Sequence, residues 1–162
     1  MTWNPADQKV YGAFYNTTKN GYVFGTLDLE TGAVNKLSDI TLQDDKGYPA
    51  GFVVIAANSI GEVYGISQMG DLYKFNTEDG SYSLIGATGY TPLYQQSGCF
   101  DFTTKQLYWA ACNENSSGIY QVNTDTGEAT LLGSFNDLEE FVGLYSLCLL
   151  YTSDAADDRI SV

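Results

Sequence analysis

Histidine is absent from the 162 residues of this chain, and this absence excludes several kinds of active site. Without an imidazole, the chain has no Ser-His-Asp or Cys-His nucleophile and no histidine ligand for a metal. Acid–base chemistry by carboxylates is the kind of catalysis that the composition leaves open.

Positive charge is also scarce. Seven Lys and Arg stand against 20 Asp and Glu, for a formal net charge of −13. Nucleic-acid phosphates and anionic membrane surfaces both attract clusters of basic side chains, so we expect neither as a partner. No segment approaches the roughly 20 apolar residues that cross a bilayer, so we expect no membrane insertion.

Cysteine is rare, with three residues in the chain. Cys99 and Cys112 fall on neighbouring predicted strands, close to cross-strand register. A disulfide between them is one interpretation if the protein is exported. The alternative is that both are small buried apolar residues with free thiols.

Aromatic residues, in contrast, make up 14% of the chain, with thirteen Tyr and eight Phe. Tyr, Phe, Val and Thr favour pleated, half-buried surfaces. Short alternating runs recur between glycine-containing turns, and no long stretch has uninterrupted helical spacing of apolar residues. The sequence therefore predicts an all-β protein, and its 44% apolar content is enough for a packed core.

A phrase of the form Leu-Tyr-x-Phe-Asn-Thr-x-x-Gly recurs along the chain. Its closing glycines, Gly32, Gly80 and Gly127, lie 48 and then 47 residues apart. Self-similarity with a period of about 20–50 residues indicates a solenoid, a propeller or an array. The repeat therefore defines a scaffold, and function is expected in the loops that vary between its copies.

Each copy of the repeat carries the signals of four short antiparallel strands, which is the content of one propeller blade. In the middle copy, the apolar run 52–57 predicts a strand that is buried on both faces. The sequence predicts a partial β-propeller of about three four-stranded blades plus the first strand of a fourth. The predicted blades are 1–40, 48–87 and 97–134, with the start of the next at 139–147.

The repeat resembles those of bacterial β-propellers of the quinoprotein-like and surface-protein kinds. The matching elements are Leu72-Tyr73-x-Phe75-Asn76-Thr77-x-x-Gly80 and Ile119-Tyr120-x-Val122-Asn123-Thr124-x-x-Gly127. The resemblance covers most of residues 1–147 and implies a fold rather than an activity. Quinoprotein blades carry a Trp shortly after the Thr-Gly turn, where this chain has Leu84 and Leu131. We therefore expect no quinone and no other cofactor.

The end of the chain differs from the repeat. Residues 148–157, Cys-Leu-Leu-Tyr-Thr-Ser-Asp-Ala-Ala-Asp, resemble the translation of a transposase sequencing adapter. We therefore expect residues 148–162 to be a non-native tail. Because closed propellers have about four to eight blades, we expect residues 1–147 to be an incomplete propeller cut from a longer gene.

Acidic residues recur at the turn before the closing glycine of each copy. They are Asp28, Glu30, Glu78, Asp79 and Asp125. Asp and Asn in such turns accept hydrogen bonds from backbone amides. Asn123-x-Asp125-x-Gly127 resembles half of a calcium loop but lacks the third carboxylate and the terminal Glu. We interpret these acids as turn residues and predict no metal site.

The connectors between blades hold the best candidates for ligand binding, because loops on a rigid scaffold usually carry function. In a propeller they share a face with the turns between the second and third strands. Tyr, Gln and Asn on this face suit stacking on a sugar or gripping a peptide, and ordinary loop composition is the alternative. The predicted ligand-binding residues are Asp44, Asp45, Tyr48, Tyr90, Tyr94, Gln95, Gln96, Asn113 and Asn115. No catalytic residue is predicted.

Three functions fit these observations. The leading hypothesis is a non-enzymatic recognition module of an exported or cell-surface bacterial protein that binds a glycan or a protein. The second is a fragment of a propeller hydrolase or lyase whose catalytic residues lie partly in missing blades. The third is a purely architectural repeat. Because both end blades lack a neighbour, we expect the fragment to associate with itself.

Overall fold

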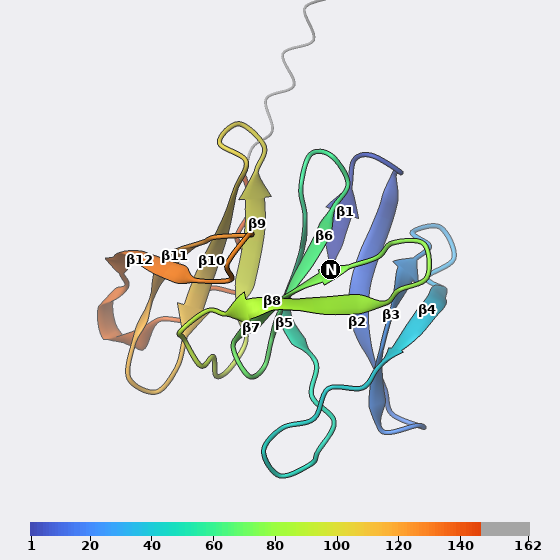
Figure 1. Ribbon diagram of the computed structural model, residues 1–162, viewed down its shortest axis with the longest axis horizontal. Coiled ribbons are helices and arrows are strands. Elements are labelled where there is room, and N and C mark those ends of the chain that lie inside the picture. The colour runs from blue at the N-terminus through green and yellow to red at the C-terminus, as the bar shows by residue number, and fades with distance from the viewer. Residues whose placement is uncertain (147–162) are drawn as a thin grey trace, which may run out of the picture.

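The computed structural model describes residues 1–146, which form three four-stranded antiparallel sheets (Figure 1). Blade 1 contains β1 (Thr2–Asn4), β2 (Lys9–Asn16), β3 (Gly21–Leu27) and β4 (Val34–Ile40). Blade 2 contains β5 (Phe52–Ala57), β6 (Val63–Ser67), β7 (Asp71–Phe75) and β8 (Tyr82–Ala87). Blade 3 contains β9 (Ser97–Asp101), β10 (Gln106–Cys112), β11 (Ser117–Val122) and β12 (Ala129–Ser134).

The predicted all-β fold is confirmed. Across residues 1–146 the helical element is a single 3₁₀ turn, Asn136–Leu138. In that same part of the chain no helix has the length and apolar character to cross a membrane.

The blades radiate from their first strands. Each sheet is a simple meander in chain order, and β5 contacts both β1 and β9. The inner strands therefore lie side by side, while the outer strands β4, β8 and β12 form the far edges of the sheets (Figure 1). This arrangement is part of a β-propeller.

All three blades share one register. The pairing of the two outermost strands shifts at equivalent places, which are Phe24/Gly25, Leu72/Tyr73 and Ile119/Tyr120. Such bulges bend the outer strand and increase its twist. The shared register assigns each residue of one blade an equivalent in the other two. Between the second and third strands, for example, the equivalent pairs are Val10–Leu27, Val63–Phe75 and Leu107–Val122.

The apolar cores lie between blades. Blades 1 and 2 meet around Phe24 and Phe75, whose stacked rings have centroids 4.1 Å apart. Blades 2 and 3 meet around the fully buried Leu72 and Trp109. Full burial of one such side chain contributes roughly 1.5–3 kcal/mol. Packing between neighbouring blades is therefore the main source of stability, as it is in other repeat proteins.

Side-chain oxygens close the turns of every blade. In the β5–β6 turn, Asn58 Oδ1 accepts the N–H groups of Ile60 (3.1 Å) and Glu62 (2.9 Å). In the β3–β4 turn, Asp28 Oδ1 accepts two N–H groups in the same way, and these bonds lower the pKa of Asp28. Equivalent caps are Asn4, Asp101, Asn76, Asn123, Asn16, Ser67 and Asn113. The recurring acids thus lie at turns whose geometry depends on these bonds.

A glycine contact couples blade 2 to blade 1 and blade 3 to blade 2. Gly80 in the β7–β8 turn has φ +75°, and a Cβ there would lie 2.7 Å from the Leu37 Cβ of blade 1. The Gly80 carbonyl accepts a hydrogen bond from Ser38 Oγ (2.6 Å). Gly127 in the β11–β12 turn has φ +87°, and its Cβ would lie 2.5 Å from the Gly86 carbonyl oxygen of blade 2. In blades 2 and 3 the closing glycine of the repeated phrase is therefore required both by its turn and by the preceding blade.

The predicted first strand of a fourth blade, within 139–147, is not a strand in the structure. Residues 139–146 have no regular secondary structure, since no described strand pairs with them. Leu144 nevertheless donates its N–H to Ser97 Oγ (2.9 Å), so this segment runs beside β9. Residue 147 and the expected tail 148–162 lie outside the described residues.

Candidate functional site

The two connectors between blades lie at one end of the blades, the lower end in Figure 1. We call the surface formed by connectors 41–51 and 88–96 and turns 17–20, 68–70 and 113–116 the connector face. The β5–β6 and β9–β10 turns lie at the opposite end of the blades (Figure 1). All nine predicted ligand-binding residues lie in these two connectors or in the 113–116 turn, and eight of them are at least partly exposed.

A pocket of about 480 Å³ opens on the connector face, where the two connectors approach the 68–70 turn. It is lined by Asp44, Asp45, Val53, Gln68, Met69, Thr91, Pro92, Leu93 and Tyr94. Three predicted residues, Asp44, Asp45 and Tyr94, therefore come together although the two connectors are far apart in sequence. We call this cavity the connector pocket.

The two acids of the connector pocket have different surroundings. Asp44 Oδ1 accepts the N–H groups of Lys46 (2.9 Å) and Tyr48 (2.8 Å), so this carboxylate shapes its own loop. Asp45 is exposed at the pocket wall. Tyr48 is exposed as well, but its side chain does not line the pocket.

Tyr94 is the aromatic residue of the connector pocket. It is 56% exposed and has φ +66°, a left-handed conformation that is unusual for a bulky residue. The preceding residue is anchored, because Leu93 donates its N–H to the Cys112 carbonyl (2.9 Å). Strained residues held by a rigid surrounding are frequent at binding sites. Gln95 is exposed next to Tyr94 but is not part of the pocket wall.

Gln96 lies inside the molecule and has a structural role. Its Nε2 donates to the carbonyls of Leu93 (2.8 Å) and Cys112 (2.7 Å), and its Oε1 accepts from Trp109 Nε1 (2.8 Å). All of its polar atoms thus bond within the protein, and the connector is fixed to blade 3.

Tyr90 and Asn113 fasten the connector 88–96 to the β10–β11 turn. Tyr90 packs edge-on against Trp109 and donates its hydroxyl to the Ser116 carbonyl (2.6 Å). Asn113 donates Nδ2 to the Thr91 carbonyl (3.1 Å), and its Oδ1 accepts the N–H of Asn115 (2.9 Å). Asn115 itself is exposed beyond the pocket. Tyr90 and Asn113 therefore hold connector 88–96, which forms part of the pocket wall, against blade 3.

Several pocket residues were missed by the sequence reasoning. Gln68 and Met69 fall in what reads as a plain turn before Gly70, and Leu93 reads as an ordinary connector residue. Gln68 Oε1 accepts the Gly51 N–H (3.0 Å), which joins the turn to the first connector. The signal that could have identified Leu93 is its neighbour Pro92, because proline restricts the backbone of a turn and so favours a loop with one defined shape next to Tyr94.

Cys99 and Cys112 do not form a disulfide, which corrects one of the two interpretations above. Cys99 lies opposite Tyr108, and Cys112 lies opposite Ser117. Cys112 lies four residues along β10 from Tyr108, so the backbone positions of the two cysteines are about 13 Å apart along the strand direction, well beyond disulfide reach. Both are free, and burial raises the pKa of each thiol.

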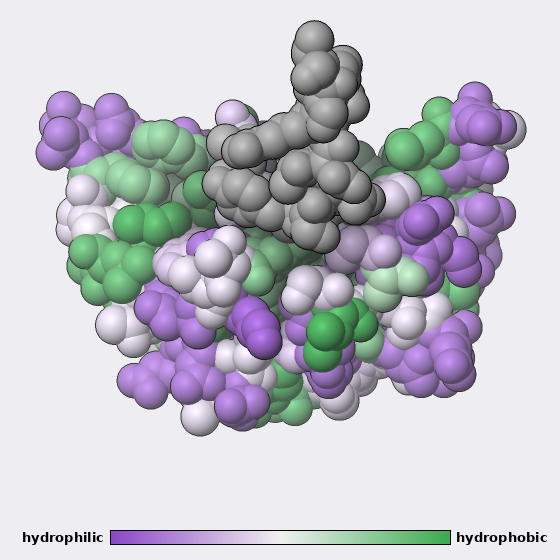
Figure 2. Space-filling view, turned by 90° about the horizontal axis from the view of Figure 1, so that it is seen from above, coloured by the Kyte–Doolittle hydropathy of each residue, from purple (hydrophilic) through white to green (hydrophobic). Residues whose placement is uncertain are grey.

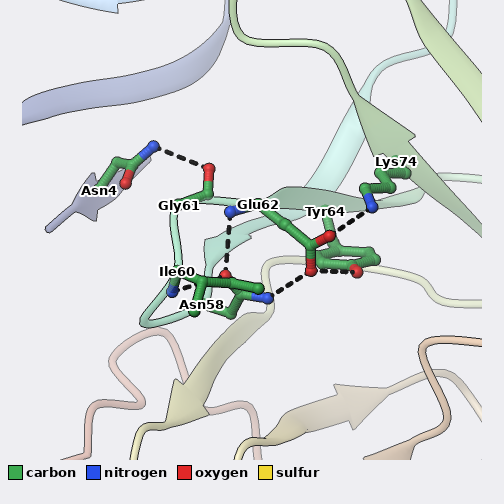
Figure 3. A network of polar contacts seen from close by, with 7 residues as sticks. All are labelled: Asn4, Asn58, Ile60, Gly61, Glu62, Tyr64 and Lys74. Atoms are coloured by element: carbon green, nitrogen blue, oxygen red, sulfur yellow. Dashed lines mark hydrogen bonds and ion pairs between the residues drawn. The ribbon is translucent and has the colours of Figure 1, made fainter. Parts of the chain in front are cut away.

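A polar network at the opposite end of the blades surrounds Glu62 (Figure 3). Its Oε1 lies 2.6 Å from Lys74 Nζ, and its Oε2 accepts from Asn58 Nδ2 (2.7 Å) and the Tyr64 hydroxyl (3.0 Å). The hydrogen bond from Lys74 lowers the pKa of Glu62, while burial raises the pKa of Tyr64 to about 12. With both oxygens paired and the carboxylate held ionised, the network stabilises a turn rather than providing an acid or a base.

This network makes stability depend on pH. Because the pKa of Glu62 is lowered from 4.5 by folding, its contribution is present above pH 4.5 and is lost as pH falls through the lowered value. Glu62→Gln should lower the free energy of unfolding at pH 7 by about 0.2–1 kcal/mol, as expected for a partly exposed ion pair. The difference from the wild type should disappear in acid, measured by urea unfolding across pH.

Glu114→Gln is the matched control, since Glu114 is an exposed acid in the β10–β11 turn. Its effect at pH 7 should be smaller than that of Glu62→Gln. An equal loss at pH 7 and in acid for Glu62→Gln would show that the ion pair is not the cause.

Among residues 1–146, no three metal-ligating side chains cluster in this network or elsewhere.

No protein-family model and no curated protein matches this chain. Two solved structures are similar in fold. One is a protein from Lactobacillus plantarum, with a TM-score of 0.48 and 21% identity over 82% of this chain and 40% of that chain. The other is a candidate 6-phosphogluconolactonase from Bacteroides uniformis, with a TM-score of 0.46 and 17% identity over 80% of this chain and 37% of that chain. The chain thus spans about two fifths of the length of these structures.

Proposed function

We propose that this protein is a non-enzymatic recognition module that binds a neutral glycan in the connector pocket. The observation that carries the proposal is Tyr94, a half-exposed aromatic residue in a left-handed conformation at the wall of a pocket of about 480 Å³. That volume lies in the range of small-molecule sites, and the pocket is built from loops on a rigid scaffold.

The lining of the pocket suits a sugar. The apolar face of Tyr94, beside Leu93, can stack against the C–H face of a pyranose ring. Asp45 and Gln68 provide a carboxylate and an amide that hydrogen-bond ring hydroxyls. Few converging polar groups in an otherwise apolar pocket are the usual pattern of an orienting site.

The charge of the protein favours a neutral or basic sugar over an acidic one. The chain carries a net charge of −13, and two carboxylates line the pocket itself. An anionic glycan would be repelled both at long range and on contact. We therefore expect acidic glycans to bind more weakly than neutral ones of the same size.

The pocket is held in one shape, which favours binding. Trp109, Gln96 and Tyr90 fix connector 88–96 from the inside, through the bonds described above. A preformed site loses less conformational entropy when a ligand binds.

The test is a screen of immobilised neutral and acidic oligosaccharides, followed by titration calorimetry of the best binder. Tyr94→Ala should weaken binding at least tenfold, since an aromatic anchor at a site centre usually contributes more than 1.4 kcal/mol. Tyr15→Ala is the control, because Tyr15 is 50% exposed on blade 1 and lies outside the pocket. The proposal fails if no glycan binds, or if both variants bind as the wild type does.

A further inference from the structure

Blade 1 exposes an apolar row that blades 2 and 3 bury or half-bury against the blade before them. The row crosses each sheet through four paired positions. It is Ala57, Val63, Phe75 and Tyr82 in blade 2, and Phe100, Leu107, Val122 and Ala129 in blade 3. The equivalents in blade 1, which we call the docking face, are Trp3, Val10, Leu27 and Val34.

Exposure separates the three copies of this row. Ala57 and Phe100, the equivalents of Trp3 in blades 2 and 3, are 3% and 6% exposed. Trp3 and Val34 on the docking face are 50% and 42% exposed. The sheet of blade 1 therefore carries the residues of a blade interface without a neighbour among the described residues.

Blade 3 exposes the other half of the same interface. On the side away from blade 2 it presents Tyr108, Ile119 and Leu132, which we call the receiving face. Their equivalents in blade 2, Tyr64, Leu72 and Ile85, pack into the core between blades 2 and 3. Leu132 is 53% exposed. Hydrophobic surface lies toward both ends of the arc of blades in the view from above (Figure 2).

The glycine contact is also split between the two ends. Gly32, the equivalent of Gly80 and Gly127, has φ +73° and no atom within 4 Å of an added Cβ. Gly133, which is equivalent to Gly86 on the other side of the contact, is likewise open. Blade 1 thus has the glycine turn, and blade 3 has the position on its outer strand against which such a turn packs.

We propose that copies of this chain associate head to tail, with the docking face of one copy against the receiving face of the next. The template is the pair of interfaces inside the molecule, since each uses the same rows and the same glycine contact. This surface is separate from the connector pocket, and the proposal does not depend on glycan binding. A heterologous contact of this kind builds rings or open chains.

One segment must yield in this assembly. In the internal interfaces the inner strand of the incoming blade lies beside the preceding inner strand, and in blade 3 residues 141–146 run beside β9. This segment is held to β9 by the Leu144–Ser97 bond, and the side chains of Phe141, Val142 and Tyr145 are exposed. We infer that β1 of the incoming copy displaces it.

The assembly is tested by sedimentation velocity of the 162-residue protein over a range of concentrations. The wild type should form dimers and longer species, and more of them at high salt, because copies with a net charge of −13 repel each other. Val34→Asp on the docking face and Leu132→Asp on the receiving face should each weaken association at least tenfold. Ile60→Asp, at a residue that is 73% exposed in the β5–β6 turn, is the control and should leave association unchanged.

Mixing the two interface variants is the decisive step. Each variant keeps one intact half, so an equimolar mixture should form a heterodimer and stop there. A wild type that stays monomeric at high salt overturns the proposal. So does a dependence on only one of the two faces, which would indicate a face that pairs with itself. A mixture that fails to associate also overturns it, because the intact docking face and the intact receiving face would then not bind each other. If an aspartate variant does not fold, Val34→Thr and Leu132→Thr make the same test with a smaller change.

Discussion

Trp109→Ala should lower the free energy of unfolding by about 3–5 kcal/mol, the usual range when a large buried aromatic side chain is removed. Trp109 is fully buried between blades 2 and 3, where Tyr90 and Tyr120 pack against its ring. The truncation also leaves Gln96 Oε1 without the donor that it has at 2.8 Å. Because a whole protein is typically stable by only about 5–15 kcal/mol, much of blade 3 should unfold under mild conditions.

Two controls separate the causes of this loss. Trp109→Phe keeps most of the ring and removes the N–H donor, so its cost should be about 1–3 kcal/mol, the penalty for an unpaired buried polar atom. Trp3→Ala changes the other tryptophan, which is 50% exposed, and should cost less than half as much as Trp109→Ala. Urea unfolding followed by circular dichroism measures all three at a concentration at which the protein is monomeric. Equal losses for Trp3→Ala and Trp109→Ala would contradict the placement of the core between blades.

The repeated phrase was sufficient to predict the all-β blades because its periodicity records local structure. The alternation of side chains and the Thr-x-x-Gly turn act within one blade, so a single sequence contains them. The strand predicted at 52–57 is β5 itself.

The candidate site was less predictable. The loops on the connector face follow from topology, so Asp44, Asp45 and Tyr94 were found by position alone. Gln96 and Tyr90 belong to the same connector as Tyr94 and are also residue types that suit ligand binding, but their side chains bond inside the molecule. Whether a connector side chain is buried in this way depends on the packing of blade 3, which the local sequence does not show. The disulfide interpretation was wrong for a related reason. The register of β9 against β10 is set by the turn between them, and it places Cys99 opposite Tyr108 rather than Cys112.

Gly127→Ala should also be strongly destabilising, and its reason is the contact between blades. Gly127 has φ +87°, where alanine is strained by about 1–2 kcal/mol. In addition, the new Cβ would lie 2.5 Å from the Gly86 carbonyl oxygen and 2.9 Å from the Gly86 Cα. Both atoms belong to the backbone of blade 2, so the two blades must move apart, at a further cost of about 1–3 kcal/mol.

Gly32→Ala is the matched control within the same protein. Gly32 closes the same turn in blade 1 and has φ +73°, but no atom lies within 4 Å of an added Cβ. Its cost in the monomer should therefore be that of the backbone conformation alone. Replacing glycine by alanine lowers the conformational entropy of the unfolded chain by the same amount at both sites, so this effect cancels when the two variants are compared.

The difference between these two unfolding free energies tests most directly the claim that the three sheets are blades joined by one repeated contact. It is measured by urea unfolding of Gly127→Ala and Gly32→Ala at the same low protein concentration. We predict that Gly127→Ala is less stable than Gly32→Ala by about 1–3 kcal/mol, the strain of an overpacked contact. Equal stabilities of the two variants would contradict the account, because they would mean that Gly127 has no blade against it.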